Sequence, residues 1–309
     1  MHKIGVMTEG VIRKENIEEG YRFIKEAGFD CIDFNFDAYL KIGDILSGNI
    51  NDVFDRPIEE VWADFKPHRE CIEKYGLAVG QTHAPFPIMM MGQDEANEKL
   101  LRIAINTIEL SHRMGSSYIV VHPLTLAFEH SAKEEHDFNI EMYTKLIPAA
   151  KKFKQTICLE NMFMGIGGHI MEAACSDFRQ AVELIDELNE IAGEELFGFC
   201  LDVGHANLLG KNLYQAVTRL GHRIKILHLH DNDGVSDLHT IPYTFMRAGG
   251  GISTDWDGFL KGMKEIGYKG VLSFETNHCM EVFPLELHAS TLKFIADIGR
   301  YFSGRIEGR

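Results

Sequence analysis

Residues 197–205 read Phe197-Gly198-Phe199-Cys200-Leu201-Asp202-Val203-Gly204-His205, an apolar run of strand length that ends at a carboxylate. A short apolar run with polar residues at its end predicts a buried strand. Five more runs end on a residue type that binds metal ions: Gln81-Thr82-His83, Val120-Val121-His122, Cys158-Leu159-Glu160, Ile226-Leu227-His228 and Ser273-Phe274-Glu275. Because the C-terminal ends of parallel strands converge on one face of a barrel, these six side chains would meet in one volume. The pattern predicts a metal site at that face.

The chain alternates between strand and helix patterns along its length. Eight strand patterns cover Lys3–Thr8, Cys31–Phe36, Ala78–His83, Tyr118–His122, Thr156–Glu160, Phe197–Asp202, Ile224–His228 and Gly270–Glu275. Helical patterns lie between them and include Ile17–Ala27, Ile58–Tyr75, Glu95–Met114, Phe178–Ile191, Trp256–Ile266 and Leu285–Tyr301. Eight such units are typical of an α/β barrel. We therefore expect a single (β/α)8 TIM barrel over residues 1–305, followed by Ile306-Glu307-Gly308-Arg309, a protease site of the kind left by expression vectors.

Composition and charge narrow the class of protein. With 31 basic and 46 acidic residues the formal net charge is −15, and no run of Lys or Arg can follow a phosphate backbone, so we expect no nucleic-acid partner. No apolar run approaches the roughly 18 residues of a membrane span, and Met1 leads into a strand pattern without a signal-peptide core. The six cysteines form no CxxC pair. We expect a soluble, cytoplasmic protein that does not bind membranes.

Seven motifs carry a resemblance to a known family. In chain order they are Gln81-Thr82-His83-Ala84-Pro85, Val121-His122-Pro123, Leu159-Glu160-Asn161, Leu201-Asp202-Val203-Gly204-His205, His228-Leu229-His230-Asp231, Asp237-Leu238-His239 and Phe274-Glu275. Together they resemble the xylose isomerase-like TIM-barrel superfamily, which includes sugar isomerases and epimerases, inosose-processing enzymes and zinc-dependent apurinic endonucleases of type IV. The resemblance runs from the first strand to the last. It is specific for fold and metal site rather than for substrate.

The resemblance implies that Glu160, Asp202, His228 and Glu275 bind one divalent cation. Three carboxylates and one imidazole suit Mn²⁺ or Zn²⁺, and also Mg²⁺ or Co²⁺. A cation that holds a hydroxyketone polarises its carbonyl and acidifies the adjacent C–H group. In the sugar epimerase branch two metal-binding glutamates move that proton through a cis-enediolate. The resemblance therefore implies that Glu160 and Glu275 are the catalytic acid and base.

Further residues at the strand ends have two interpretations, contact with substrate or binding of an additional metal. They are His83, His122, His205, Asp237 and His239. In the endonuclease branch the resemblance implies that His83 and His122 hold a second zinc with Glu160, and that the other three hold a third zinc. For His230, which shares a strand face with His228, we expect a hydrogen-bonding role.

The sequence favours a metal-dependent isomerase or epimerase that acts on a small sugar or a polyol-derived hydroxy-carbonyl compound. Ketose 3-epimerases that resemble this chain carry a glutamate and an arginine where it has Ile166 and Gly234, which argues against a standard ketose 3-epimerase. The alternative is a multi-zinc phosphodiesterase similar to the apurinic endonucleases. All nine ligand types support it, and the net charge of −15 opposes it. A third option, a barrel that binds a sugar without turnover, has no need of two opposed glutamates.

Two other stretches have alternative interpretations. The apolar stretch at residues 86–91 follows the third strand and predicts either a cap over the substrate or a subunit contact, so a homo-oligomer stays open. The run Gly249-Gly250-Gly251 predicts either a phosphate-binding turn or an ordinary turn before a helix cap, and Arg247 beside it is a candidate contact for an anionic substrate.

Overall fold

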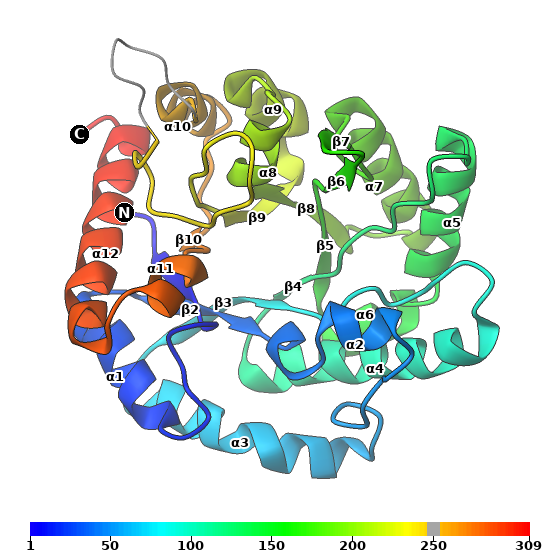
Figure 1. The fold of residues 1–309 in the computed structure, drawn as a ribbon, viewed down its shortest axis with the longest axis horizontal. Helices are drawn as coiled ribbons and strands as arrows, with labels where there is room; N and C mark the ends of the chain where they lie inside the picture. Colours follow the sequence, from blue (N-terminus) through cyan, green and yellow to red (C-terminus); the bar gives the residue numbers. More distant parts are fainter. Residues whose placement is uncertain (246–253) are drawn as a thin grey trace.

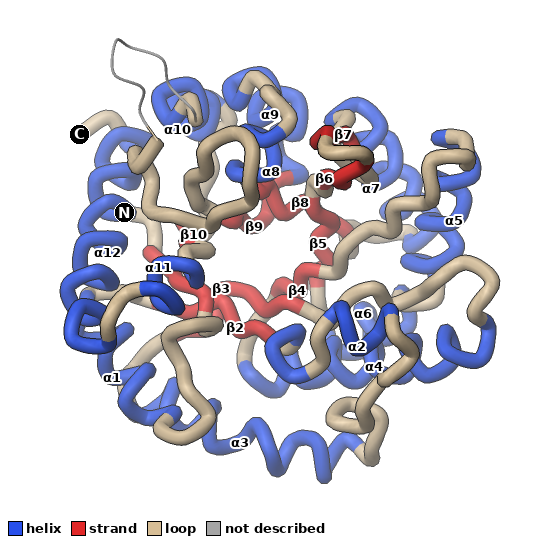
Figure 2. The backbone as a smooth tube through the Cα atoms, viewed as in Figure 1, coloured by secondary structure: helices blue, strands red, loops and turns tan. Residues whose placement is uncertain are grey.

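The centre of the molecule is a closed barrel of parallel strands, seen end-on in Figure 2. The structure is a computed structural model that describes residues 1–245 and 254–309. The barrel strands are β1 (Ile4–Met7), β2 (Cys31–Asn35), β3 (Ala78–His83), β4 (Tyr118–Val120), β5 (Thr156–Glu160), β8 (Phe197–Asp202), β9 (Ile224–His228) and β10 (Leu272–Phe274). They pair in the order β10-β1-β2-β3-β4-β5-β8-β9. The backbone N–H of Leu229 donates to the carbonyl of Ser273 at 2.9 Å, which closes the ring between β9 and β10.

Helices form a ring outside the strands (Figure 1). They are α1 (Ile17–Ala27), α2 (Ile42–Leu46), α3 (Ile58–Lys74), α4 (Asp94–Met114), α5 (Ala132–Thr144), α6 (Ile147–Phe153), α7 (Phe178–Ala192), α8 (Val203–Leu208), α9 (Leu213–Leu220), α10 (Trp256–Glu265), α11 (Asn277–Val282) and α12 (Leu285–Glu307), with short 3-10 helices at Asp37–Tyr39 and Gly221–Arg223. Several begin at an Asn or Asp whose side chain accepts a bond from the first turn, as Asp177 does for α7. The helices cover the outer face of the sheet, so both faces are buried.

The barrel interior is filled by side chains rather than left as a pore. Val120, Cys158, Cys200 and Ile226 form a cluster of their own inside the ring, and each is at most 1% exposed. Each of them stands two positions before a candidate ligand at a strand end, and it faces the same way because alternate residues of a strand share a face. The cluster therefore forms a floor under the strand ends.

The predicted fold class is confirmed, because all eight predicted strands form and pair in parallel around one barrel. One element was not predicted from the sequence, an antiparallel hairpin of β6 (Phe163–Ile166) and β7 (His169–Glu172). It follows β5 at the mouth of the barrel. The shorter helices, among them α2, α8 and α11, were not predicted either. These elements are short and contribute few residues to the core.

The predictions for Gly249-Gly250-Gly251 and Arg247 lie outside the described residues. Across the two ranges that the structure describes, no helix combines the length and the apolar character that a membrane crossing requires.

Candidate metal centre

Glu160, the last residue of β5, is the point on which four histidines converge. Its carboxylate is 1% exposed. Oε2 lies 3.3 Å from His122 Nε2, 3.3 Å from His228 Nδ1 and 3.9 Å from His83 Nε2, while Oε1 lies 3.4 Å from His205 Nδ1. The five residues come from four different strand ends and from α8, so only the closed barrel brings them together.

The four ligands implied for a divalent cation lie around one imidazole nitrogen. Nδ1 of His228 is 3.1 Å from Glu275 Oε2, 3.3 Å from Glu160 Oε2 and 3.9 Å from Asp202 Oδ2. The three carboxylates are only 0%, 1% and 7% exposed. Burying several carboxylates together is costly unless a cation compensates their charge.

Among the described residues, two buried atoms without hydrogen-bond partners lie within these four candidate ligands. Within the described part of the chain, Glu160 Oε2 and His228 Nδ1 are buried and have no hydrogen-bond partner. Buried polar atoms are normally paired, and a set of orphaned ligand atoms that face one another is what a cation site looks like without its ion. The residues therefore fit a divalent ion by charge, by donor type and by the direction of their free atoms.

The carboxylate of Asp202 is held by hydrogen bonds to both of its oxygens, which fixes its orientation. It caps α8 by accepting a bond from the backbone N–H of His205 at 2.6 Å, and its Oδ2 accepts from His230 Nε2 at 3.1 Å. Asn161 donates to the Asp202 carbonyl at 2.8 Å and accepts from its N–H at 2.9 Å, which clamps the ends of β5 and β8 together. His230 thus has the hydrogen bond that we expected for it.

The surroundings of Glu160 and Glu275 shift the pKa values of the two carboxyl groups in opposite directions. Burial raises the pKa of Glu275, and the neighbouring carboxylates of Asp202 and Glu160 add to the rise. Burial acts in the same sense on Glu160, but His228 and His122 outweigh it and hold its pKa well below the usual value. Two carboxyl groups of one site therefore have different proton affinities.

His83 and His122 form a pair beside Glu160. Their Nε2 atoms are 2.9 Å apart, and His83 Nδ1 lies 2.9 Å from the carbonyl of Ala84. Because a carbonyl only accepts, His83 carries its proton on Nδ1 and turns a lone pair on Nε2 toward the site. The ring of Phe86 packs 4.0 Å from that of His122, and burial lowers the pKa of His122 to about 4.

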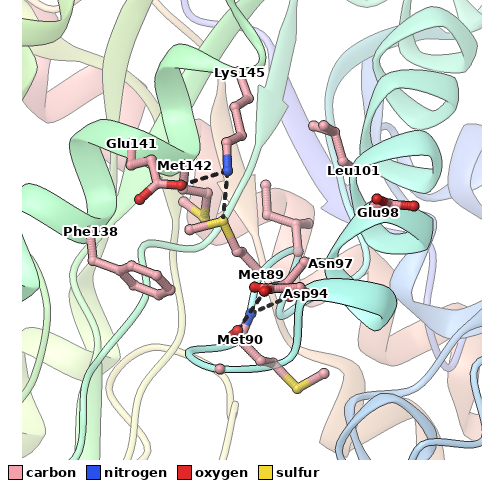
Figure 3. A pocket seen from close by; sticks show the side chains of 12 residues that line it. Met89, Met90, Asp94, Asn97, Glu98, Leu101, Phe138, Glu141, Met142 and Lys145 are labelled. Carbon is pink, nitrogen blue, oxygen red and sulfur yellow. Dashed lines mark hydrogen bonds and ion pairs between the residues drawn. The ribbon is translucent and has the colours of Figure 1, made fainter.

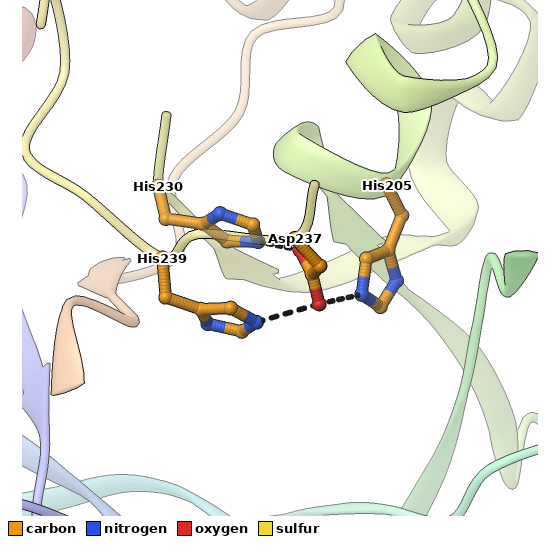
Figure 4. A group of neighbouring side chains, drawn as sticks. All are labelled: His205, His230, Asp237 and His239. Carbon is orange, nitrogen blue, oxygen red and sulfur yellow. Dashed lines mark hydrogen bonds and ion pairs between the residues drawn. The ribbon is translucent and has the colours of Figure 1, made fainter. Parts of the chain in front are cut away.

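A second group of ligand types lies on the far side of Asp202 and is drawn in Figure 4. Asp237 Oδ2 is 2.9 Å from His239 Nε2 and 3.4 Å from His205 Nε2, and its Oδ1 is 3.8 Å from His230 Nε2. The rings of His230 and His239 stack at 3.9 Å. Ligand atoms of these four residues all lie within 4.8 Å of one another. The structure thus brings the three ambiguous residues of this region into one group and adds His230 to it.

Sequence reasoning missed Asp33, which reaches the site from the opposite side of the barrel. It lies on β2, is 0% exposed, and its Oδ2 is 3.1 Å from His228 Nε2 and 2.7 Å from Gln81 Nε2. A signal was present, because Cys31, Asp33 and Asn35 share one strand face and an aspartate inside a barrel needs a partner.

A separate cavity of about 320 Å³ lies between the loop after β3 and α5 (Figure 3). Met89, Met90, Met142, Leu101 and Phe138 line it, and at its edge Lys145 pairs with Glu141, one turn earlier on α5, at 2.7 Å. Its lining includes part of the apolar stretch that follows the third strand, and none of the candidate ligands belongs to it.

Fold and site together define the class: a (β/α)8 barrel with a buried carboxylate–histidine cluster at the C-terminal ends of its strands. Residues 21–298 match the family model described as xylose isomerase-like TIM barrel. The chain belongs to this family, as the motifs predicted.

The chain is also similar to individual proteins. The chain is 28% identical to an uncharacterized protein of Methanocaldococcus jannaschii over 219 residues, which cover 68% of each chain. It is 26% identical to the inosose isomerase of Bacillus subtilis over 168 residues, which are 54% of this chain and 56% of that protein. Among solved structures it is similar to an L-ribulose 3-epimerase, with a TM-score of 0.69, 17% identity, and 100% of this chain and 97% of the other covered.

Proposed function

We propose that the protein is a divalent-metal-dependent isomerase or epimerase of a small sugar or a polyol-derived ketone. The observation that carries the proposal is that two buried glutamates, Glu160 and Glu275, face the same nitrogen of His228 at 3.3 and 3.1 Å. Support for the substrate class comes from the family and from relatives named as an inosose isomerase and a sugar epimerase.

In this proposal Glu160, Asp202, His228 and Glu275 hold the ion, with Mn²⁺ or Zn²⁺ as the first candidates. A divalent ion held there would supply Lewis-acid chemistry, polarising a substrate carbonyl and acidifying the neighbouring C–H group. One glutamate takes the proton from that carbon, and the other returns a proton from the opposite face of the cis-enediolate. Burial of both carboxylates keeps bulk water away from the reacting carbon during the transfer, and each glutamate exchanges its proton with solvent between turnovers.

We further propose that His83 and His122 orient the substrate. His122 Nε2 donates to His83 Nε2 at 2.9 Å, and a substrate hydroxyl that displaced this bond would find one acceptor and one donor there. Phe86 behind His122 and Phe163, whose ring lies 5.0 Å from that of His205, provide apolar surfaces for the C–H face of a sugar ring.

The residues at positions 166 and 234 help to choose between substrate classes. Ile166 lies at the end of β6 and is 38% exposed, and Gly234 lies in the loop after β9 with a positive φ of 77°. Neither position can supply the carboxylate or guanidinium that ketose 3-epimerases resembling this chain carry there. We therefore place a cyclic polyol ketone such as an inosose ahead of an open-chain ketose.

Hydrogen exchange at carbon tests the proposal. Protein loaded with Mn²⁺ or Zn²⁺ is incubated in D₂O with inososes and a panel of ketoses, and deuterium next to the carbonyl is followed by NMR. We expect deuterium to enter at least one ketone and to stop entering when a chelator removes the ion. Absence of exchange across the whole panel with either ion contradicts the proposal.

The second candidate is a multi-zinc phosphodiesterase. The observation that favours it is that two more ligand groups adjoin the first, His83 with His122 and Glu160, and His205 with His230, Asp237 and His239. Zinc-loaded protein would then cleave a DNA duplex that carries one abasic site. The formal net charge of −15 disfavours binding to a polyanion, so we expect no cleavage.

We also propose a cytoplasmic location. All six cysteines are buried free thiols, the state that a reducing compartment maintains.

A further inference from the structure

A hydrogen bond crosses the barrel beneath the candidate metal centre. It joins Asp33 on β2 to His228 on β9, 195 positions apart in the sequence, with Oδ2 and Nε2 3.1 Å apart. Both side chains are buried, at 0% and 1% exposure. The strand order places β1 and β10 between these two strands, so the contact passes through the barrel interior rather than between neighbours.

The contact determines which nitrogen of His228 is free. An ionised carboxylate can only accept a hydrogen bond, so Nε2 of His228 must carry a proton and donate it in the hydrogen bond to Asp33. In the neutral ring that metal binding requires, the other nitrogen, Nδ1, then turns its lone pair toward Glu160, Asp202 and Glu275, which lie 3.1 to 3.9 Å away. The opposite tautomer would place a proton where the ion should bind.

Gln81 holds the carboxylate in place. Its Nε2 donates to Asp33 Oδ2 at 2.7 Å and to the carbonyl of Leu227 at 3.2 Å. Leu227 is the residue before His228, so one amide group ties the carboxylate to the strand that carries the histidine. Asp33 therefore has little freedom to rotate away from the imidazole.

We propose that Asp33 is a positioning residue of the metal centre, which sets the tautomer and ring orientation of His228 from across the barrel. The inference rests on the proposed metal centre. Outer carboxylates that bond to a metal-binding imidazole orient the ring and raise its basicity, and their loss typically lowers metal affinity about 10- to 100-fold. Asp33 itself does not touch the ion or the substrate.

Metal affinity is the first test, measured by competition with a chromogenic chelator. We expect Asp33→Leu to weaken Zn²⁺ binding about 10- to 100-fold, and Asp33→Asn to weaken it less, because the amide oxygen still accepts from Nε2. Asp30→Asn is the matched control. Asp30 precedes the same strand at the other end of the barrel, where Oδ2 accepts from the N–H of Ile4 at 2.8 Å. The control should bind Zn²⁺ as the wild type does.

A second measurement needs no variant, so it stands even if Asp33→Leu fails to fold. Nitrogen-15 NMR of the zinc-loaded wild-type protein reports the state of each imidazole nitrogen. We expect His228 to bind zinc through Nδ1 and to carry a proton on Nε2. Binding through Nε2, or wild-type affinity in Asp33→Leu, overturns the inference. If the wild type binds no divalent ion, the proposed function itself fails, which is a distinguishable result.

Discussion

His83 and His122 meet tip to tip, with their Nε2 atoms 2.9 Å apart and both rings beside Oε2 of Glu160. The bond from His83 Nδ1 to the carbonyl of Ala84 fixes the orientation of the first ring. The two imidazole rings therefore form a preorganised binding site for one polar group. In a one-metal isomerase that group would be a substrate hydroxyl, and in a multi-zinc esterase a second metal ion would bind there instead.

His122→Asn separates these two roles. If the pair orients substrate, the variant loses one hydrogen bond, worth about 0.5 to 1.5 kcal/mol, so KM rises about 2- to 12-fold. The number of bound ions stays the same, as elemental analysis will show. Loss of an ion from the variant contradicts the substrate role. His112→Asn, at an exposed position of α4, is the matched control.

Glu160→Gln and Glu275→Gln test the acid–base pair. Each change keeps the shape of the side chain but removes its ability to take a proton, so exchange of the substrate C–H should fall about 10²- to 10⁴-fold. Exchange is measured in D₂O after each variant has been saturated with metal. Glu183→Gln, at an exposed position of α7, should keep the wild-type rate. A variant that retains its rate removes that glutamate from the mechanism.

Gly204→Ala tests the packing behind Asp202. A methyl group at this position would stand 1.9 Å from Cε1 of His230, so the imidazole must move and lose its bond to Asp202. We expect the free energy of unfolding to fall by about 1 to 3 kcal/mol, as for other overpacked cores. Chemical denaturation measures it.

Gly43→Ala is the control for that change. Gly43 lies within α2, and an added methyl group would meet nothing within 4 Å. The control should be neutral or more stable, because alanine favours a helix by up to about 1 kcal/mol over glycine. Equal losses in the two variants would contradict the predicted clash.

His68 should make stability depend on pH. It lies between the hydroxyl groups of Tyr21 and Tyr39, at 3.1 and 3.0 Å, and burial lowers its pKa from 6.5 to about 4. Between those pH values the unfolded chain binds the proton more readily, so stability is full above pH 6.5 and is lost as pH falls.

The loss from His68 should reach about 2 kcal/mol at pH 5. His68→Gln has no titrating ring, so its free energy of unfolding should fall less steeply between pH 7.5 and pH 5 than that of the wild type. The comparison of the two proteins isolates His68 from other buried histidines. Parallel curves for the two proteins would show that His68 contributes nothing to the pH dependence.

Most of the fold could be predicted, because each barrel strand is a short apolar run and each run closes on a polar residue. The same periodicity placed Glu160, Asp202, His228 and Glu275 on one face, since strand ends in a parallel barrel all point the same way. The hairpin β6–β7 was missed although Gly167 and Gly168, both with positive φ, form its turn. Two adjacent glycines between short runs are a hairpin signal.

Contacts across the barrel could not be predicted in the same way. The bond between Asp33 and His228 depends on the width of the barrel and on the rotamer of each side chain, neither of which is local to the sequence. His230 joins the group around Asp237 for a similar reason, because only the glycine at position 204 leaves room for its ring. Periodicity predicts which face a residue is on but not its partner on that face.

The central feature of the proposed site is one divalent ion held by Glu160, Asp202, His228 and Glu275. Native mass spectrometry of the wild-type chain, after equilibration with Mn²⁺ or Zn²⁺ and removal of the excess, counts bound ions directly. One tightly held ion per chain, absent from His228→Leu, is the predicted result. A chain that retains no ion contradicts the metal centre, and a chain that retains three zinc ions contradicts the isomerase in favour of the esterase.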